Sequence, residues 1–206
     1  RRLISILALQ TGTVVRGVTL ECELGLSAGA VRTSISRLRR LLGPDALTTT
    51  PLGYTLDAVV DVIEFERLAA SAPTHRDDTA RDLLEQATRL WRGAPLVEFA
   101  SEPWALGAVA RLNEAHATAV EDLAVILLDV GEAAIALPAI QALIDDHPYR
   151  DRPRALLVRA LAESGRRTDA LRAFQTYRTL LLDEIGTEPS SALAALDRAV
   201  ASAPTT

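Results

Sequence analysis

Residues 25–43 read GLSAGAVRTSISRLRRLLG, and this stretch decides the fold of the first part of the chain. Ser27 is a suitable N-cap residue and Gly43-Pro44 is a typical helix exit, so the stretch predicts a helix that ends at Leu42. One narrow arc of that helix is apolar and consists of Val31, Ile35, Leu38 and Leu42. The opposite arc consists of Arg32, Thr33, Ser36, Arg37, Arg39 and Arg40. The helix is therefore amphipathic, and its polar arc contains no carboxylate.

The polar arc has two interpretations: the solvated face of a structural helix, or a surface that contacts DNA. Ordinary exposed helix faces mix signs, so that carboxylates and arginines pair at a spacing of four residues. A guanidinium group binds a guanine edge or a phosphate with two parallel hydrogen bonds, and hydroxyl groups bind phosphate oxygens or base edges. An arc of arginines and hydroxyls without acids therefore favours DNA contact.

The neighbouring segments strengthen this interpretation. Apolar spacing predicts two earlier helices, over Arg1–Gln10 and about Thr19–Leu24, the second stopped by Gly25. Residues 47–50 and 54–56 flank Pro51-Leu52-Gly53 and predict a β-hairpin. Three helices followed by a hairpin within residues 1–57 indicate a winged helix-turn-helix. The hydroxyls expected near the hairpin tip belong to Thr48, Thr49, Thr50 and Tyr54.

Two of these side chains have alternative roles. Tyr54 either contacts DNA beside the groove or packs under the wing, and the sequence leaves both open. Arg16 either reaches a backbone phosphate from the first inter-helix turn or is an exposed arginine without a role.

Beyond Asp57 we expect no further strands, and helices are predicted over Val62–Ala70, Asp77–Trp91 and about Trp104–Val130, with an irregular connection before the last of these. A shift of 34 residues superimposes six identical pairs: Leu123 on Leu157, Leu127 on Leu161, Gly131 on Gly165, Ala136 on Ala170, Leu137 on Leu171 and Ala139 on Ala173. A period of this length with a glycine between two helices is typical of tetratricopeptide repeats. Trp91 and Trp104 are expected to pack around the Gly/Pro-containing connection between two of these helices.

Composition narrows the classes of function. The chain of 206 residues has 22 basic residues, all arginine, so neither a phosphate-binding P-loop nor a lysine Schiff base is possible. Three histidines (His75, His116, His147) lie in different segments without metal-ligand spacing, and Cys22 is expected in the core. No carboxylate pair is placed for acid–base catalysis. We therefore expect no enzyme, no cofactor and no metal site.

The same composition bears on location and completeness. No apolar run is long enough to span a bilayer, and a single cysteine fits a reducing compartment, so we expect a cytoplasmic protein without a membrane partner. The absence of Met suggests that the sequence is a piece of a longer protein, and the ending Ala203-Pro-Thr-Thr206 is typical of a linker.

Charge is distributed unevenly along the chain. Residues 1–57 contain seven arginines and four acids, whereas residues 58–206 contain fifteen arginines and twenty-three acids, and the formal net charge is −5. A basic first part joined to an acidic second part indicates a polyanion-binding module attached to a region with another task.

Several segments together resemble the SARP-type bacterial transcriptional regulators. They are VRTSISRLRRLLG (31–43), the wing LTTTPLGYTLD (47–57), LWRGAPL (90–96) and the stretch from Ser164 to Val200, with LDEIGTEP (182–189) the most specific part. In that family an OmpR-type winged helix precedes a tetratricopeptide-like bacterial transcriptional activation domain, the BTAD. The fold expected from this resemblance is mainly α, with domains at 1–57 and 58–206. Two departures are that nothing before Arg1 supplies the family's N-terminal β-sheet and that residues 19–29 are shorter than their counterpart.

The resemblance implies a transcriptional activator whose helix Ala28–Leu42 enters the major groove of direct-repeat promoter DNA. On this hypothesis Arg32 and Ser36 read bases, and Arg37, Arg39 and Arg40 mostly neutralise phosphates. Thr33 lies on the same face, with Thr49, Thr50 and Tyr54 of the wing beside the groove. The helical domain would favour homodimers and contact RNA polymerase.

An alternative is a protein-interaction or sensor module of a larger multidomain regulator, in which the winged helix is a degenerate relic. An enzyme is the remaining class, and the absence of any catalytic constellation argues against it.

Overall fold

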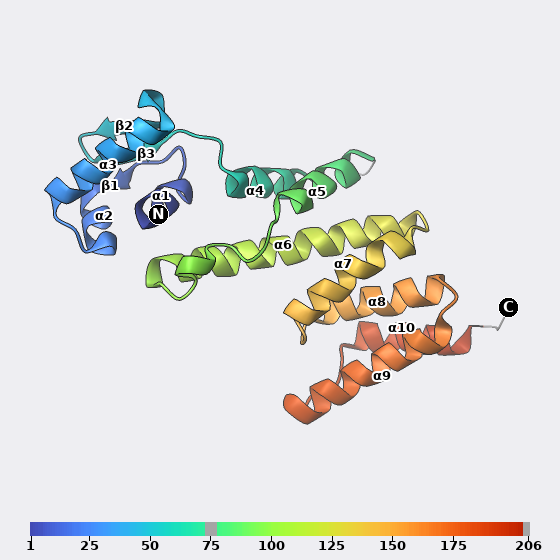
Figure 1. Ribbon diagram of the computed structural model, residues 1–206. Helices are drawn as coiled ribbons and strands as arrows, with labels where there is room; N and C mark the ends of the chain where they lie inside the picture. The colour runs from blue at the N-terminus through green and yellow to red at the C-terminus, as the bar shows by residue number, and fades with distance from the viewer. Residues whose placement is uncertain (73–77, 204–206) are drawn as a thin grey trace. The chain divides into compact units, whose positions relative to one another are not determined.

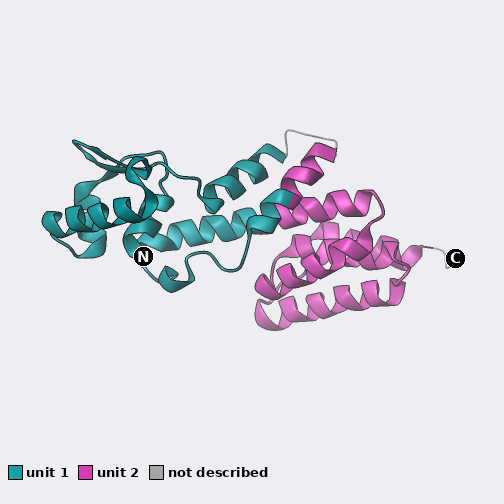
Figure 2. Cartoon of the chain, turned by 45° about the horizontal axis from the view of Figure 1, so that its top comes forward, with its two compact units in different colours: residues 1–75, 86–116 teal, residues 76–85, 117–206 magenta. Residues whose placement is uncertain are grey.

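The computed structural model describes residues 1–72 and 78–203 (Figure 1). The chain separates into two compact units (Figure 2). One contains Arg1–His75 and Gln86–His116, and the other contains Arg76–Glu85 and Ala117–Thr206. We describe the elements of each unit separately.

The first unit begins with three helices and a small sheet. The helices are α1 (Arg2–Ala8), α2 (Gly17–Leu24) and α3 (Ala28–Leu42), and a short 3-10 turn, η1 (Pro44–Ala46), follows them. The strands are β1 (Val15–Arg16), β2 (Leu47–Thr50) and β3 (Gly53–Leu56), all antiparallel to their neighbours in the order β1-β3-β2. The predicted three helices and hairpin are confirmed. Strand β1 was not predicted, because two residues are too few to show an alternating pattern.

The core of this part forms where the helices meet the sheet. Buried apolar side chains come from each of the three helices and three strands: Leu3, Ile6 and Leu7 from α1, Val15 from β1, Leu20 from α2, Val31 and Ile35 from α3, and Leu47 and Leu56 from the hairpin. Gly25 ends α2 in the left-handed conformation (φ 62°), as its position predicted. Ser27 caps α3, and its Oγ accepts a hydrogen bond from the Ala30 N–H at 3.4 Å.

Two burial predictions in this region were wrong. Leu42 was placed in the apolar stripe of α3, but it is 46% exposed, because the last turn of the helix extends beyond the side chains that bury Val31 and Ile35. Cys22 was placed in the core but is exposed, since α2 directs Leu20 inward and Cys22 lies on its outer side.

Gly53 permits the close approach of β1 to β3. A Cβ atom at this position would lie 2.0 Å from the carbonyl oxygen of Val15 and 2.8 Å from Cα of Arg16. Real Cβ atoms do not approach backbone this closely, so a glycine is required where the central strand meets β1. The pairing of Arg16 with Gly53 is therefore a direct consequence of the sequence at one position.

The rest of the described chain is helical. Its elements are α4 (Asp61–Ser71), α5 (Asp78–Leu90), the 3-10 turn η3 (Val97–Phe99), α6 (Pro103–Asp129), α7 (Ala133–Asp146), α8 (Asp151–Glu163), α9 (Arg167–Glu184) and α10 (Ser191–Ser202). The three predicted helices correspond to α4, α5 and α6, although Asp77 lies outside the described residues. Beyond β3 the described residues contain no further strand.

The 34-residue repeat extends to individual backbone hydrogen bonds. Gly131, between α6 and α7, and Gly165, between α8 and α9, both adopt positive φ, 81° and 74°. The N–H of Glu132 donates to the Leu127 carbonyl at 2.8 Å, and the N–H of Arg166 donates to the Leu161 carbonyl at 2.8 Å. Both pairs are related by the same shift of 34 residues. The repeat predicted from identical residues is thus also a repeat in the geometry of the turns between helices. The helices of the repeat share one hydrophobic core.

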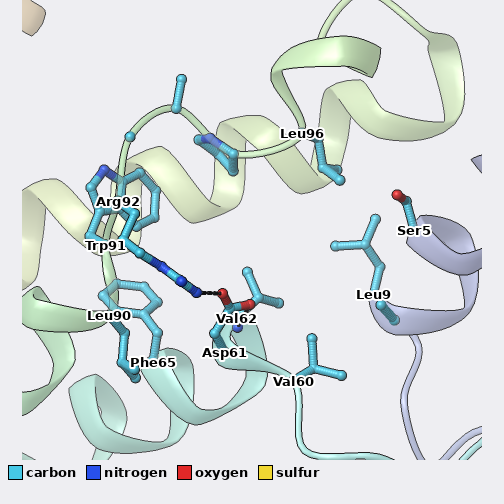
Figure 3. A pocket seen from close by; sticks show the side chains of 14 residues that line it. Ser5, Leu9, Val60, Asp61, Val62, Phe65, Leu90, Trp91, Arg92 and Leu96 are labelled. Carbon is cyan, nitrogen blue, oxygen red and sulfur yellow. Dashed lines mark hydrogen bonds and ion pairs between the residues drawn. The ribbon is translucent and has the colours of Figure 1, made fainter. Parts of the chain in front are cut away.

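The connection between α5 and α6 is held by aromatic packing and an ion pair (Figure 3). The ring of Trp91 stacks on His116 at 4.1 Å and lies 5.5 Å from Phe65, while the ring of Trp104 lies 5.4 Å from Phe99. Arg92 pairs with Asp61 at 2.5 Å across a mostly apolar cavity of about 310 Å³. The predicted packing role of the two tryptophans is consistent with these contacts.

We predict that Gly53→Ala destabilises the first unit by about 1–3 kcal/mol, because the new methyl group overlaps the Val15 carbonyl. Gly107→Ala is the matched control: nothing lies within 4 Å of its added Cβ, and alanine favours a helix, so stability should rise by about 0.5–1 kcal/mol. Urea unfolding followed by circular dichroism measures both changes. A Gly53→Ala protein as stable as the parent would contradict the close approach.

Candidate nucleic-acid interface

Helix α3 presents one apolar and one cationic face. Val31 and Ile35 are buried in the core, and Leu38 packs at its edge. The residues predicted to face DNA include five that are exposed: Arg32, Thr33, Ser36, Arg37 and Arg40. The Thr33 hydroxyl donates to the carbonyl of Gly29 at 3.0 Å, so part of its hydrogen-bonding capacity serves the helix itself. Exposure of the other four leaves their polar groups open to a ligand.

The arginines of α3 differ from those of the helical region. Within the described residues, Arg32, Arg37 and Arg40 have no carboxylate within 4.0 Å. In the second unit most arginines are paired, for example Arg81 with Glu132 at 2.7 Å and Arg178 with Glu188 at 2.7 Å. The positive charge on α3 is therefore not neutralised within the described chain.

Arg150 and Arg152 show the contrast most clearly. Both contact Glu121, at 2.5 and 3.1 Å, and this carboxylate is 0% exposed. A buried charge is tolerated when it is paired and hydrogen-bonded, and these two guanidinium groups meet that condition. These arginines of the second unit thus have a structural role that Arg32, Arg37 and Arg40 on α3 lack.

Arg39 occupies a position between the two faces. Its Nε donates to the carbonyl of Leu47 at 2.8 Å, and its Nη2 donates to Oγ1 of Thr49 at 2.6 Å. Both acceptors belong to β2, so Arg39 ties the last turns of α3 to the wing. Arg39 was predicted to contact phosphate, and its tie to β2 was not foreseen, because nothing in the helix pattern shows which arginine points toward a strand.

The predicted wing residues also differ in whether their polar groups are exposed or already used within the fold. Thr49 is exposed and accepts the bond from Arg39. The Thr50 hydroxyl is used by the hairpin turn, where it accepts from the N–H groups of Gly53 and Leu52 at 3.1 and 3.3 Å. Tyr54 is half-buried and packs against the core, which favours its packing role over DNA contact. Arg16, on β1, is exposed.

A hollow of about 180 Å³ lies between the first turns of α3 and the wing. Arg32, Thr49 and Tyr54 line it, together with Glu21 of α2. The proximity of Glu21 was not predicted, since it depends on the turn between α2 and α3. The structure therefore brings Arg32 and the three predicted wing residues, Thr49, Thr50 and Tyr54, to one place, while Arg37 and Arg40 do not line this hollow.

Residues 1–72 and 78–203 show neither a metal-ligand cluster nor a membrane-spanning helix. That part of the chain contains no group of three or more His, Cys, Asp or Glu side chains arranged to hold a metal ion. His75, one of the three histidines, lies outside it. None of its helices combines the length and the apolar composition that a membrane crossing requires.

Comparison with known proteins agrees with the architecture. The family model "Bacterial transcriptional activator domain" (BTAD) matches residues 60–201. The chain belongs to this family. The regulatory protein DnrI of Streptomyces peucetius is 35% identical over 97% of this chain and 82% of its own length. The match to DnrI also places the chain in the SARP-type family.

Other BTAD relatives are longer. The regulatory protein AfsR of Streptomyces coelicolor is 34% identical over 97% of the chain, which spans 22% of AfsR. A structure of Mycobacterium tuberculosis EmbR in complex with a low-affinity phosphopeptide has a TM-score of 0.82 and 26% identity; it covers 97% of this chain and 58% of its own. The expected winged helix followed by helical repeats is thus the fold of a solved relative.

We predict that Arg39→Ala lowers the free energy of unfolding by about 1–2 kcal/mol, because two hydrogen bonds from a charged donor to β2 are lost. Arg40→Ala is the matched control, since Arg40 is exposed and has no carboxylate partner in the described chain, and its effect should stay within about 0.5 kcal/mol. Thermal and urea unfolding would show the difference. Equal effects of the two substitutions would mean that the tie to β2 contributes nothing.

Proposed function

We propose that residues 1–57 bind double-stranded promoter DNA through α3, which enters the major groove with the wing alongside it. The observation that carries the proposal is the exposed arc of α3, where Arg32, Arg37 and Arg40 have no carboxylate partner among the described residues. Charge of this kind attracts the DNA backbone and releases its counterions. A helix-turn-helix places its second helix at the base edges.

The positions of the side chains suggest a division of labour. Arg32 and Ser36, one helical turn apart, would contact bases, and Arg37 and Arg40 would contact phosphates. Arg39 would act mainly by holding the wing, because its guanidinium already bonds Leu47 and Thr49. Thr33, Thr49, Thr50 and Tyr54 would then line the border of the interface, with Thr50 and Tyr54 shaping the wing more than touching DNA.

For residues 58–206 we propose the task of a BTAD in an activator: homodimer formation on direct-repeat promoter DNA and contact with RNA polymerase. The family match over residues 60–201 supports this. The acidic balance of this region, fifteen arginines against twenty-three acids, would keep it off the DNA backbone.

The second candidate function is a protein-interaction or sensor module of a larger regulator. It is supported by the coverage of AfsR, of which the chain matches 22%. In this case the helical repeats would carry the function, and α3 would keep its charge without a DNA target.

We predict that Arg37→Ala and Arg40→Ala each weaken binding to all DNA sequences about equally. Each should reduce the slope of log K against log salt concentration by about 0.9, the value for one lost phosphate contact on B-form DNA. Fluorescence anisotropy with promoter fragments at several salt concentrations measures the slope. Arg198→Ala in α10 is the control and should leave the slope unchanged. An Arg37→Ala plus Arg40→Ala protein with the parent's affinity would rule out α3 as the DNA contact.

We predict that Arg32→Ala changes specificity rather than the salt slope alone. Loss of a two-pronged contact to a base edge should cost about 1–3 kcal/mol at one operator position and leave binding to unrelated DNA almost unchanged. Competition with a set of single-base operator variants identifies that position. A loss spread evenly over all sequences would reassign Arg32 to a phosphate.

A further inference from the structure

A groove of about 450 Å³ runs along α8 with walls from α7 and α9, entirely within the second unit. Its apolar surface comes from Leu137 and Pro138 of α7, Leu157 and Leu161 of α8, and Ala173 of α9. Three arginines also line it, Arg154, Arg166 and Arg172, with Asp169 the one acid among its lining residues. The groove thus combines an apolar wall with a surplus of positive charge.

Asp169 does not remove this surplus. Its two carboxylate oxygens bond Arg166 at 2.9 Å and Arg172 at 3.3 Å, so one negative charge serves two guanidinium groups. The groove lies in the part of the chain where acids outnumber arginines, twenty-three to fifteen. A cationic groove within an acidic region attracts a compact anionic group at short range and repels a long polyanion at long range.

Arg154 is the least satisfied cation in the groove. Its Nη2 donates to the Pro148 carbonyl at 3.1 Å, and its guanidinium lies 4.9 Å from the centre of the Tyr177 ring. Its Nε is buried and has no hydrogen-bond partner in the described chain, and no carboxylate of that chain forms an ion pair with it. Burial lowers the pKa of Arg154, against the opposite influence of Tyr177 and Asp145. A partly desolvated cation of this kind is stabilised by an added carboxylate.

We propose that this groove binds an acidic peptide segment of a partner protein, with one carboxylate on Arg154 and a neighbouring apolar side chain against Leu157 and Leu161. The charge of the groove selects a carboxylate, and its apolar wall selects a side chain that a free anion lacks. DNA is disfavoured as the occupant by the acidic surroundings. This role is separate from DNA binding and requires none of the residues of α3.

The test uses the 206-residue chain and a short fluorescein-labelled peptide of alternating glutamate and leucine, with fluorescence anisotropy as the readout. We expect saturable binding that Arg154→Gln weakens about tenfold or more. Arg198→Gln, the same change at an exposed arginine of α10, should bind as the parent does. A second peptide with glutamine in place of glutamate should bind at least about tenfold more weakly than the first.

Ala173→Glu covers the case in which Arg154→Gln does not fold, which circular dichroism would reveal. The new carboxylate would enter the groove, compete for the arginines and abolish peptide binding, while a helix accommodates glutamate well. Equal affinity of parent and Ala173→Glu, equal affinity for the two peptides, or no binding by the parent would each overturn the proposal. A triple variant of α3, Arg32→Ala plus Arg37→Ala plus Arg40→Ala, should still bind the peptide. Loss of binding in this variant would overturn the proposal, since the peptide would then occupy α3. Promoter binding by Arg154→Gln stays at the parent level, so failure here and failure of the DNA proposal are distinguishable.

Discussion

The geometry of the N-terminal part depends on a side chain that is absent. Because Gly53 has no Cβ, the central strand β3 accepts β1 on one edge while it pairs with β2 on the other. Strand β1 leads directly into α2, so this pairing also sets where the helix-turn-helix begins. Arg39 supplies the second connection, from α3 to β2. The sheet is thereby joined to both ends of the helix-turn-helix, and the exposed arc of α3 takes its direction from it.

Arginine is used for two different physical purposes in this chain. In the helical repeats it bonds carboxylates and carbonyls, and the buried Glu121 with Arg150 and Arg152 is the clearest example. On α3 the same residue type stands without acids. Net charge alone does not reveal this, since the chain as a whole is negative at −5. The distribution of partners distinguishes a cation that stabilises the fold from one that is available to a ligand.

Sequence patterns predicted much of the fold because the patterns are local. The amphipathic spacing of α3, the stop at Gly25 and the 34-residue identities each depend on residues close in sequence or on a regular period. Strand β1 was not predicted, because two residues are too few to show the alternating pattern of a strand. Leu42 was misplaced because a helical wheel shows the side of a helix but not where the core beneath it ends.

The sequence predicted which face of α3 forms the candidate site, but it did not predict what each side chain on that face or on the wing contacts. Helical spacing identified the arc that contains Arg32, Arg37 and Arg40, and the structure leaves all three exposed. It did not separate Arg39 from them, since that distinction requires the position of β2. Thr50 and Tyr54 were likewise selected for their hydroxyl groups, whereas hairpin geometry and packing determine what they contact.

The exposed arc of α3 carries its charge on guanidinium groups alone, and the chain has no lysine. Guanidinium stays protonated at any cellular pH, and no ε-amino group is present to be acetylated. The charge that this face offers is therefore fixed once the chain is made. Regulation through pH or through lysine acetylation is therefore closed to this face, since neither protons nor acyl groups can remove its charge.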